Sequence, residues 1–247
     1  MPRRVEEHFR ALIQGKIFEG VAKPIVTEAV MSVETPRDRF LRFCPGGFTD
    51  PSFLRLERDY KWAAHETWCE LLNEPEFDRL LTEENYEEIC RRAVKIEGKT
   101  KFMLTRYEKA ALHDGVKGEK PAKLFANGLY DLVYGKDDFE TRFQEFAKDL
   151  EHLPERQTSP VKWTIITMFP FLADPAKHMF LKPQVTKLAA KRRHFSLNYR
   201  PELSWLTYSC LLRFADVLWQ EVADLKPRDM LDIQSYIWVT ESWKRTP

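Results

Sequence analysis

SWLTYSCLLRFADVLWQEVADL, which spans residues 204–225, is the stretch that decides the fold class. Large apolar side chains recur in it every three or four positions, at Trp205, Tyr208, Leu212, Ala215, Trp219 and Val222. This spacing places them on one face of an α-helix. Ser204 stands at the N-cap position, where its hydroxyl can accept a free backbone N–H of the first turn. The stretch therefore predicts a long amphipathic helix packed on a core.

Helical spacing of apolar residues recurs along most of the chain. It predicts further helices over residues 4–14, 53–74, 82–96, 100–114, 121–134, 139–153 and 183–193. Ser52 is predicted to cap the second of these, and Asp137 or Asp138 the helix over 139–153. The predicted buried face of the helix over 53–74 consists of Phe53, Leu56, Tyr60, Ala63, Thr67, Trp68 and Leu71.

Residues 163–172 are the one stretch whose secondary structure stays open. They are rich in β-branched and aromatic side chains, and a continuous apolar run fits a buried helix as well as a strand. The sequence therefore predicts a mainly α fold, an irregular multi-helix bundle. At most one short strand or extended segment, near 163–172, would interrupt it.

The polar stretch PERQTSP at residues 154–160 is the best linker candidate. It would divide a helical N-terminal region, 1–153, from a helical C-terminal region, 161–247, packed on it. A single domain is the alternative. The closing stretch 227–239 is too apolar for a free end, so we expect it to dock on the core.

Composition limits the classes of function and location. The net charge is +1, from 39 basic and 38 acidic side chains, so the chain as a whole does not attract polyanions. No apolar run approaches the roughly 20 residues needed to cross a bilayer, which predicts no membrane contact. The charged start, Met1-Pro2-Arg3-Arg4, is followed by no apolar stretch, and the 4 cysteines are scattered. We therefore expect a cytoplasmic protein with reduced thiols.

Motifs for cofactors and metals do not occur in the sequence. Glycine is scarce, at 9 residues, and no glycine-rich phosphate loop or dinucleotide fingerprint is present. His65-Glu66 lacks the second histidine of a metalloprotease helix. The sequence therefore predicts no cofactor and no metal site.

Four short segments carry a resemblance to known sequences. They are ERDYK at 57–61, ADP at 173–175, HMFLKP at 178–183 and PRDMLDIQSYIWV at 227–239. In these segments the chain resembles a family of uncharacterised bacterial proteins. The resemblance touches both halves of the chain, and it implies no activity, cofactor or partner.

The strongest local signal is a basic segment without any acidic residue. Between Asp174 and Glu202 no Asp or Glu occurs. Cationic side chains neutralise phosphates, and the interleaved aromatic rings can stack on unpaired bases. The segment predicts a non-enzymatic binding protein for DNA, RNA or another polyanion, unless acidic partners come from elsewhere in the fold. The candidate binding residues are Lys177, His178, Lys182, Lys187, Lys191, Arg192, Arg193 and Arg200.

A second candidate is an arginine followed by a histidine seven positions later, at Arg58 and His65. The pair resembles the Arg-x4–6-His motif of helical HEPN ribonucleases. That resemblance implies a metal-independent ribonuclease in which Arg58 stabilises phosphate charge and His65 moves protons. The alternative is structural, with the arginine paired to an acid and the histidine satisfied by its neighbours.

Two further candidates lie in the closing stretch. Asp229, Asp232 and Gln234 resemble the metal-binding edge of restriction-type nucleases, although Gln234 stands where that pattern has a lysine. In the alternative, Asp229 caps a helix, and Gln234 and Ser235 bind buried backbone. Tyr236 and Trp238 would be the contact of a protein–protein adaptor if they do not dock internally.

Overall fold

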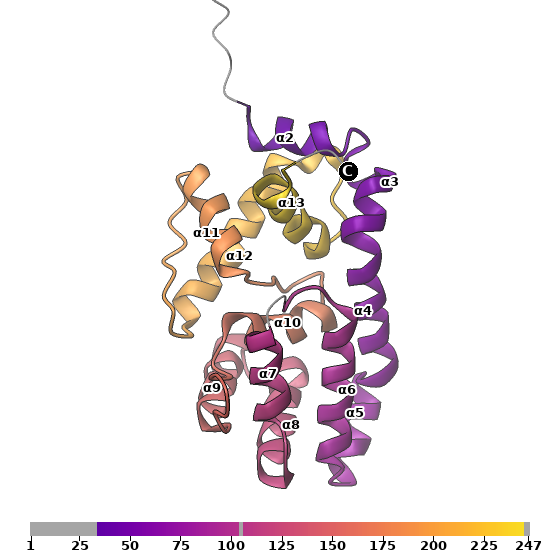
Figure 1. Cartoon of the computed structure of the whole chain (residues 1–247), viewed down its shortest axis with the longest axis vertical. Coiled ribbons are helices and arrows are strands. Elements are labelled where there is room, and N and C mark those ends of the chain that lie inside the picture. The colour runs from indigo at the N-terminus through magenta and orange to yellow at the C-terminus, as the bar shows by residue number, and fades with distance from the viewer. Residues whose placement is uncertain (1–33, 104–105, 245–247) are drawn as a thin grey trace, which may run out of the picture. The chain divides into compact units, whose positions relative to one another are not determined.

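The computed structural model describes residues 34–103 and 106–244, and all regular structure in them is helical (Figure 1). The predicted mainly α fold is therefore confirmed, while the predicted helix over 4–14 lies outside the described residues. The helices are α2 Pro36–Phe43, α3 Pro51–Phe53, α4 Asp59–Leu71, α5 Glu74–Thr82, α6 Tyr86–Lys99, α7 Arg106–Gly115, α8 Glu119–Tyr134, α9 Phe139–His152, α10 Trp163–Ala173, α11 Pro183–Arg192, α12 Trp205–Glu221 and α13 Met230–Ser242.

Polar side chains begin several helices as the sequence predicts. Asp138 accepts a hydrogen bond from the backbone N–H of Thr141 at the start of α9. Ser204 does the same for Thr207 at the start of α12. Asp229 accepts the backbone N–H groups of the first turn of α13. Each cap satisfies donors that the helix itself leaves free.

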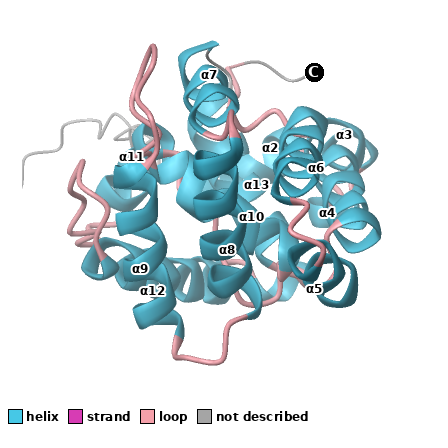
Figure 2. Ribbon diagram, turned by 90° about the horizontal axis from the view of Figure 1, so that it is seen from below, coloured by secondary structure: helices cyan, strands magenta, loops and turns pink. Residues whose placement is uncertain are grey.

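The stretch 163–172, which the sequence leaves open between a buried helix and a strand, forms the helix α10. Every residue from Trp163 to Leu172 is buried. The helix packs on α4, α7, α8 and α9, and Figure 2 shows it among the other helices. A helix buried on all sides needs no polar face, which is why its sequence lacks helical periodicity.

Helices on both sides of the predicted linker share contacts. The residues from Glu34 onward cluster into one compact unit, and the segment 154–160 lies inside it.

α8 and α9 approach so closely at Gly128 that a Cβ atom there would lie 2.9 Å from the Phe146 ring. This glycine therefore permits the close packing of two helices.

The closing stretch docks on the core, as predicted. α13 packs against α2, α11 and α12, and most of its residues are buried. α13 also packs against the π-helical turn Leu54–Arg58. This turn joins α3 to α4 in one continuous helix (Figure 1). α13 and this turn together position the candidate site.

The face that this continuous helix buries differs from the predicted one. Its N-cap is Asp50 and not the predicted Ser52, whose own backbone N–H donates to the Asp50 side chain. Ala63, predicted to be buried, is exposed. The residues that the π-helical turn and α4 bury are Glu57, Arg58, Lys61, Ala64 and Trp68. The prediction failed because three of these five are charged, and a hydrophobicity pattern does not assign charged residues to a core.

Among the described residues, no helix combines the length and the apolar character required to traverse a lipid bilayer.

Candidate functional site

A buried ion-pair network joins the π-helical turn to the start of α13. Arg58 donates from Nη2 to Asp229 Oδ2 at 2.7 Å, and its Nη1 lies 3.2 Å from Asp232 Oδ1. Arg228 donates from Nε to Asp232 Oδ2 at 2.8 Å. Arg58, Asp229 and Asp232 are buried. Because buried charges are tolerated only when paired, this network fixes where α13 begins.

A second buried ion pair, between Lys61 and Glu57, lies on the same continuous helix. Lys61 Nζ lies 3.1 Å from Glu57 Oε2 and donates to Ser235 Oγ on α13 at 2.6 Å. The other oxygen of Glu57 accepts the indole N–H of Trp243 at 3.1 Å. Burial lowers the pKa of Lys61, and the negative charge of Glu57 opposes that shift. Lys61 thus binds one oxygen of the Glu57 carboxylate, and Trp243 binds the other.

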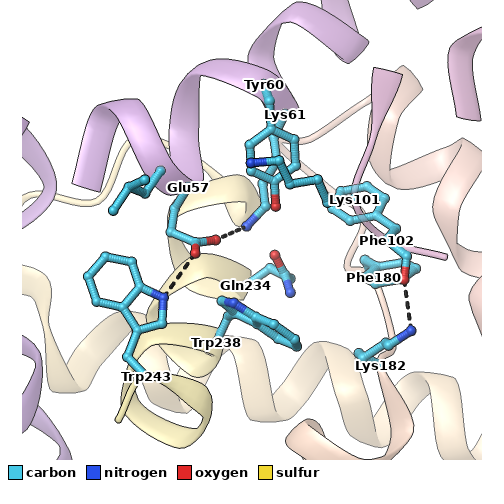
Figure 3. A pocket seen from close by; sticks show the side chains of 11 residues that line it. Glu57, Tyr60, Lys61, Lys101, Phe102, Phe180, Lys182, Gln234, Trp238 and Trp243 are labelled. Atoms are coloured by element: carbon cyan, nitrogen blue, oxygen red, sulfur yellow. Dashed lines mark hydrogen bonds and ion pairs between the residues drawn. The ribbon is translucent and has the colours of Figure 1, made fainter. Parts of the chain in front are cut away.

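A cavity of about 240 Å³ lies beside this pair, between the π-helical turn, α4 and α13 (Figure 3). Its lining also includes the segments around Phe102 and Phe180, which are stacked with ring centroids 4.4 Å apart. Apolar surface predominates, as in small-molecule sites. The aromatic residues that line the cavity are Tyr60, Phe102, Phe180, Trp238 and Trp243.

Gln234 supplies the cavity with an amide whose oxygen has no hydrogen-bond partner among the described residues. The residue is 5% exposed, and its Oε1 accepts no hydrogen bond from any described residue. Figure 3 shows this amide between Tyr60 and Lys61 on one side and Trp238 on the other. A buried carbonyl without a donor costs about 1–3 kcal/mol. The Gln234 amide therefore leaves hydrogen-bonding capacity in the cavity wall that the described residues do not use.

Positive charge lies at the cavity. Lys182 Nζ is 3.1 Å from Glu108 Oε2 and donates to the backbone oxygen of Phe102 at 2.7 Å. Lys101 is exposed, and its ammonium lies 4.7 Å from the centre of the Tyr60 ring. Of the described cations that line the cavity, Lys101 has no carboxylate within ion-pair distance. It is the charge best placed to receive an anion.

Carboxylates pair with half of the predicted basic segment. In addition to the Lys182–Glu108 pair, the segment makes four ion pairs. They are Lys177 with Asp174 at 2.8 Å, Arg192 with Glu241 at 3.0 Å, Arg193 with Glu221 at 2.6 Å, and Arg193 with Glu241 at 3.8 Å. Glu221 and Glu241 belong to α12 and α13, so local sequence does not reveal them. These pairings reduce the positive field that the segment alone suggests.

The other four residues of the segment have different surroundings. Lys187 lies over the Tyr199 ring at 4.7 Å, and Lys191 and Arg200 are exposed. His178 stacks on Phe139, with ring centroids 4.2 Å apart, and its Nδ1 lies 3.3 Å from Tyr208 Oη. His178 is thus packed among aromatic rings.

The packing of half-buried His178 among aromatic rings predicts a pH dependence of stability. Burial lowers its pKa from 6.5 to about 4, with Arg142 and Lys177 adding to the shift and Asp174 opposing it. The stability from the neutral ring is complete above pH 6.5 and is lost as the pH falls toward 4, by at most about 3 kcal/mol. His178→Phe keeps a ring on Phe139 and should flatten this decline. Urea unfolding measured from pH 7 to pH 4 tests this prediction. The same fall of the unfolding free energy with pH in the native protein and in His178→Phe would contradict it.

Arg58 and His65 contact the same side chain. The Arg58 guanidinium lies 4.9 Å from the Trp62 ring centre, and the His65 ring lies 4.8 Å from it. His65 Nδ1 is 2.6 Å from the backbone oxygen of Leu172. Cleavage chemistry at this pair would require Arg58 to leave the carboxylates of α13.

The acidic pair of the closing stretch is bound by arginines. Asp229 and Asp232 contact Arg58 and Arg228 as described above, and Asp229 also caps α13. Within residues 34–103 and 106–244, no group of three or more His, Cys, Asp or Glu side chains is placed to hold a metal ion. Gln234 differs from the predicted alternative, because its amide oxygen accepts no backbone N–H.

The two aromatic residues predicted for an adaptor surface have different positions. Tyr236 is fully buried and donates its hydroxyl to Glu221. Trp238 is half-buried and lines the cavity. Three cavity residues that we selected for different reasons, Lys182, Gln234 and Trp238, therefore meet at one place.

No model of a known protein family matches the chain, and neither a curated protein nor a solved structure matches it. Function is therefore inferred from the geometry of the cavity.

Proposed function

We propose that the protein binds a small aromatic anion in the cavity between the π-helical turn and α13. The observation that carries this proposal is the amide of Gln234, which is buried, without a donor for its oxygen, and in the lining of an aromatic cavity. Small-molecule sites typically combine apolar walls with a few such polar groups.

The walls support a flat ligand. Tyr60 and Trp238 lie on opposite sides of the Gln234 amide (Figure 3). Aromatic side chains bind planar rings by offset stacking or edge contacts. A cavity of about 240 Å³ offers room for one small ring system. The ligand is therefore expected to insert its ring between side chains of α4 and α13.

The charges support an anionic substituent. Glu57 and Lys61 neutralise each other, as do Glu108 and Lys182, and Lys101 adds a further positive charge. The predicted binding of polyanions by the 177–200 segment is thus narrowed to a small anion, with Lys182 as the shared residue. Because the carboxylate of Glu57 is held by Lys61 and Trp243, the proposal is binding without catalysis.

Binding of 8-anilinonaphthalene-1-sulfonate, an aromatic sulfonate that fluoresces in apolar sites, tests the proposal. We expect one saturable site in the native protein. Trp238→Ala should weaken binding by about tenfold, as loss of an aromatic contact at a site centre commonly does. Lys101→Glu should also weaken it, because the new carboxylate repels the sulfonate.

The matched controls are two exposed residues outside the cavity, Trp62→Ala and Lys95→Glu. Both should leave the affinity for the sulfonate near that of the native protein. Equal losses in the Trp62 and Trp238 variants would contradict the proposed site, and so would an absence of saturable binding.

A further inference from the structure

We infer that the occupant of the cavity is a mononucleotide whose base is read by the amide of Gln234. This inference rests on the proposed function and names the chemical class of its ligand. It goes beyond an aromatic anion, because it specifies hydrogen-bonding groups on the ring.

The first step concerns what the amide requires. Gln234 Oε1 needs a donor, and its Nε2, which makes no hydrogen bond with any described residue, offers two N–H groups. Unsubstituted benzoate and benzenesulfonate ions carry acceptors only, and the sulfonate probe adds a single anilino N–H. Nucleobases present a donor and an acceptor side by side on one edge, and glutamine pairs with adenine in this way at its N6 and N7 atoms.

The second step concerns competition from other groups in the cavity. Glu57 is the other strong acceptor there, and both of its oxygens are already bound, one by Lys61 and one by Trp243. In Figure 3 its carboxylate points toward those two residues. The donor of a base is thus directed to Gln234.

The third step concerns the rest of the ligand. Bases stack on aromatic faces irrespective of their sequence identity, and the cavity is lined by five aromatic residues. Lys101 is exposed and without a carboxylate partner among the described cavity residues. A ribose phosphate that leaves the cavity would bring its charge to such an ammonium. One such cation suits a monophosphate better than a long polyanion.

Calorimetric titration with AMP, GMP, CMP and UMP tests the inference directly, with ribose 5-phosphate as the probe that lacks a base. We expect at least one nucleotide to bind at submillimolar concentration and to displace the aromatic sulfonate, while ribose 5-phosphate does neither. Gln234→Met removes the hydrogen bonds at similar volume. It should lower the ratio of nucleotide to sulfonate affinity by about tenfold or more, as loss of a two-point base contact does.

The matched control is Gln220→Met, at an exposed position on α12, which should keep the native ratio. Thermal unfolding of each variant identifies any that fails to fold. Sulfonate binding without displacement by any nucleotide would overturn this inference and leave the proposed function standing. Absence of both kinds of binding would overturn both. Binding of a ten-nucleotide single strand without any mononucleotide would overturn the inference in favour of nucleic acid.

Discussion

Replacement of Arg58 by methionine is expected to lower the free energy of unfolding by about 3–5 kcal/mol, the usual cost of leaving a buried charge unpaired. Methionine fills much of the arginine's volume but cannot bind Asp229, whose two oxygens both contact Arg58. Asp232 would then have Arg228 as its remaining ion-pair partner. Urea unfolding at neutral pH measures the loss directly.

The control for this variant is Arg79→Met. Arg79 also binds two carboxylates, Glu76 and Glu83, but on an exposed helix surface. Such surface pairs contribute about 0–1 kcal/mol. Similar losses in the two variants would show that burial does not set the strength of the Arg58 network. A ribonuclease assay on Arg58 variants must therefore be read together with their stability.

Lys61→Met is expected to be the second severe substitution, also about 3–5 kcal/mol, because it leaves Glu57 buried with an indole N–H as its donor. The double variant Lys61→Met with Glu57→Gln should recover most of this loss. It removes both charges, and an uncharged pair of similar volume avoids the cost of desolvation. Urea unfolding of the native, single and double variants at pH 7 checks the expected order.

A Lys61→Met variant that is as stable as the native protein would contradict that order. Equal stability would mean that Lys61 is uncharged in the fold, because replacing an uncharged amine leaves no carboxylate newly unpaired. Burial lowers the pKa of Lys61, so repeating the measurement at pH 9 shows whether its charge contributes to stability.

The sequence was sufficient for several helices that have one apolar face and a polar cap. Asp138, Ser204 and Asp229 begin their helices in the structure as their positions in the sequence predict. It was insufficient for residues 163–172, because a helix buried on every side carries no periodic signal. Local pattern therefore predicted the surface helices better than the central one.

Charged residues in the core explain the other failure of prediction. Glu57, Arg58 and Lys61 occupy positions that pattern analysis gives to solvent, yet they are buried. Their partners on α13 lie more than 170 positions away in the chain, at Asp229 and Ser235. Only tertiary structure brings such partners together, and the same holds for Glu108, Glu221 and Glu241, which pair with the 177–200 segment.

The cavity could be predicted only in fragments. Lys182, Gln234 and Trp238 each stood out in the sequence, but as parts of three separate candidates. Lys101 and Phe102 follow the last turn of α6 and carry no motif at all. Their role depends on which helices pack together, and helical periodicity does not determine that choice.

The π-helical turn Leu54–Arg58 also bears on how related chains should be compared. Such a turn closes its hydrogen bonds from residue i to residue i+5, here from Asp59 back to Leu54, and so holds one residue more than an ordinary turn. A homologue without that residue could keep α4 and its cavity face in register. A one-residue gap within 54–58 is therefore compatible with a retained binding site, whereas the same gap within Asp59–Leu71 would rotate the later residues off the core.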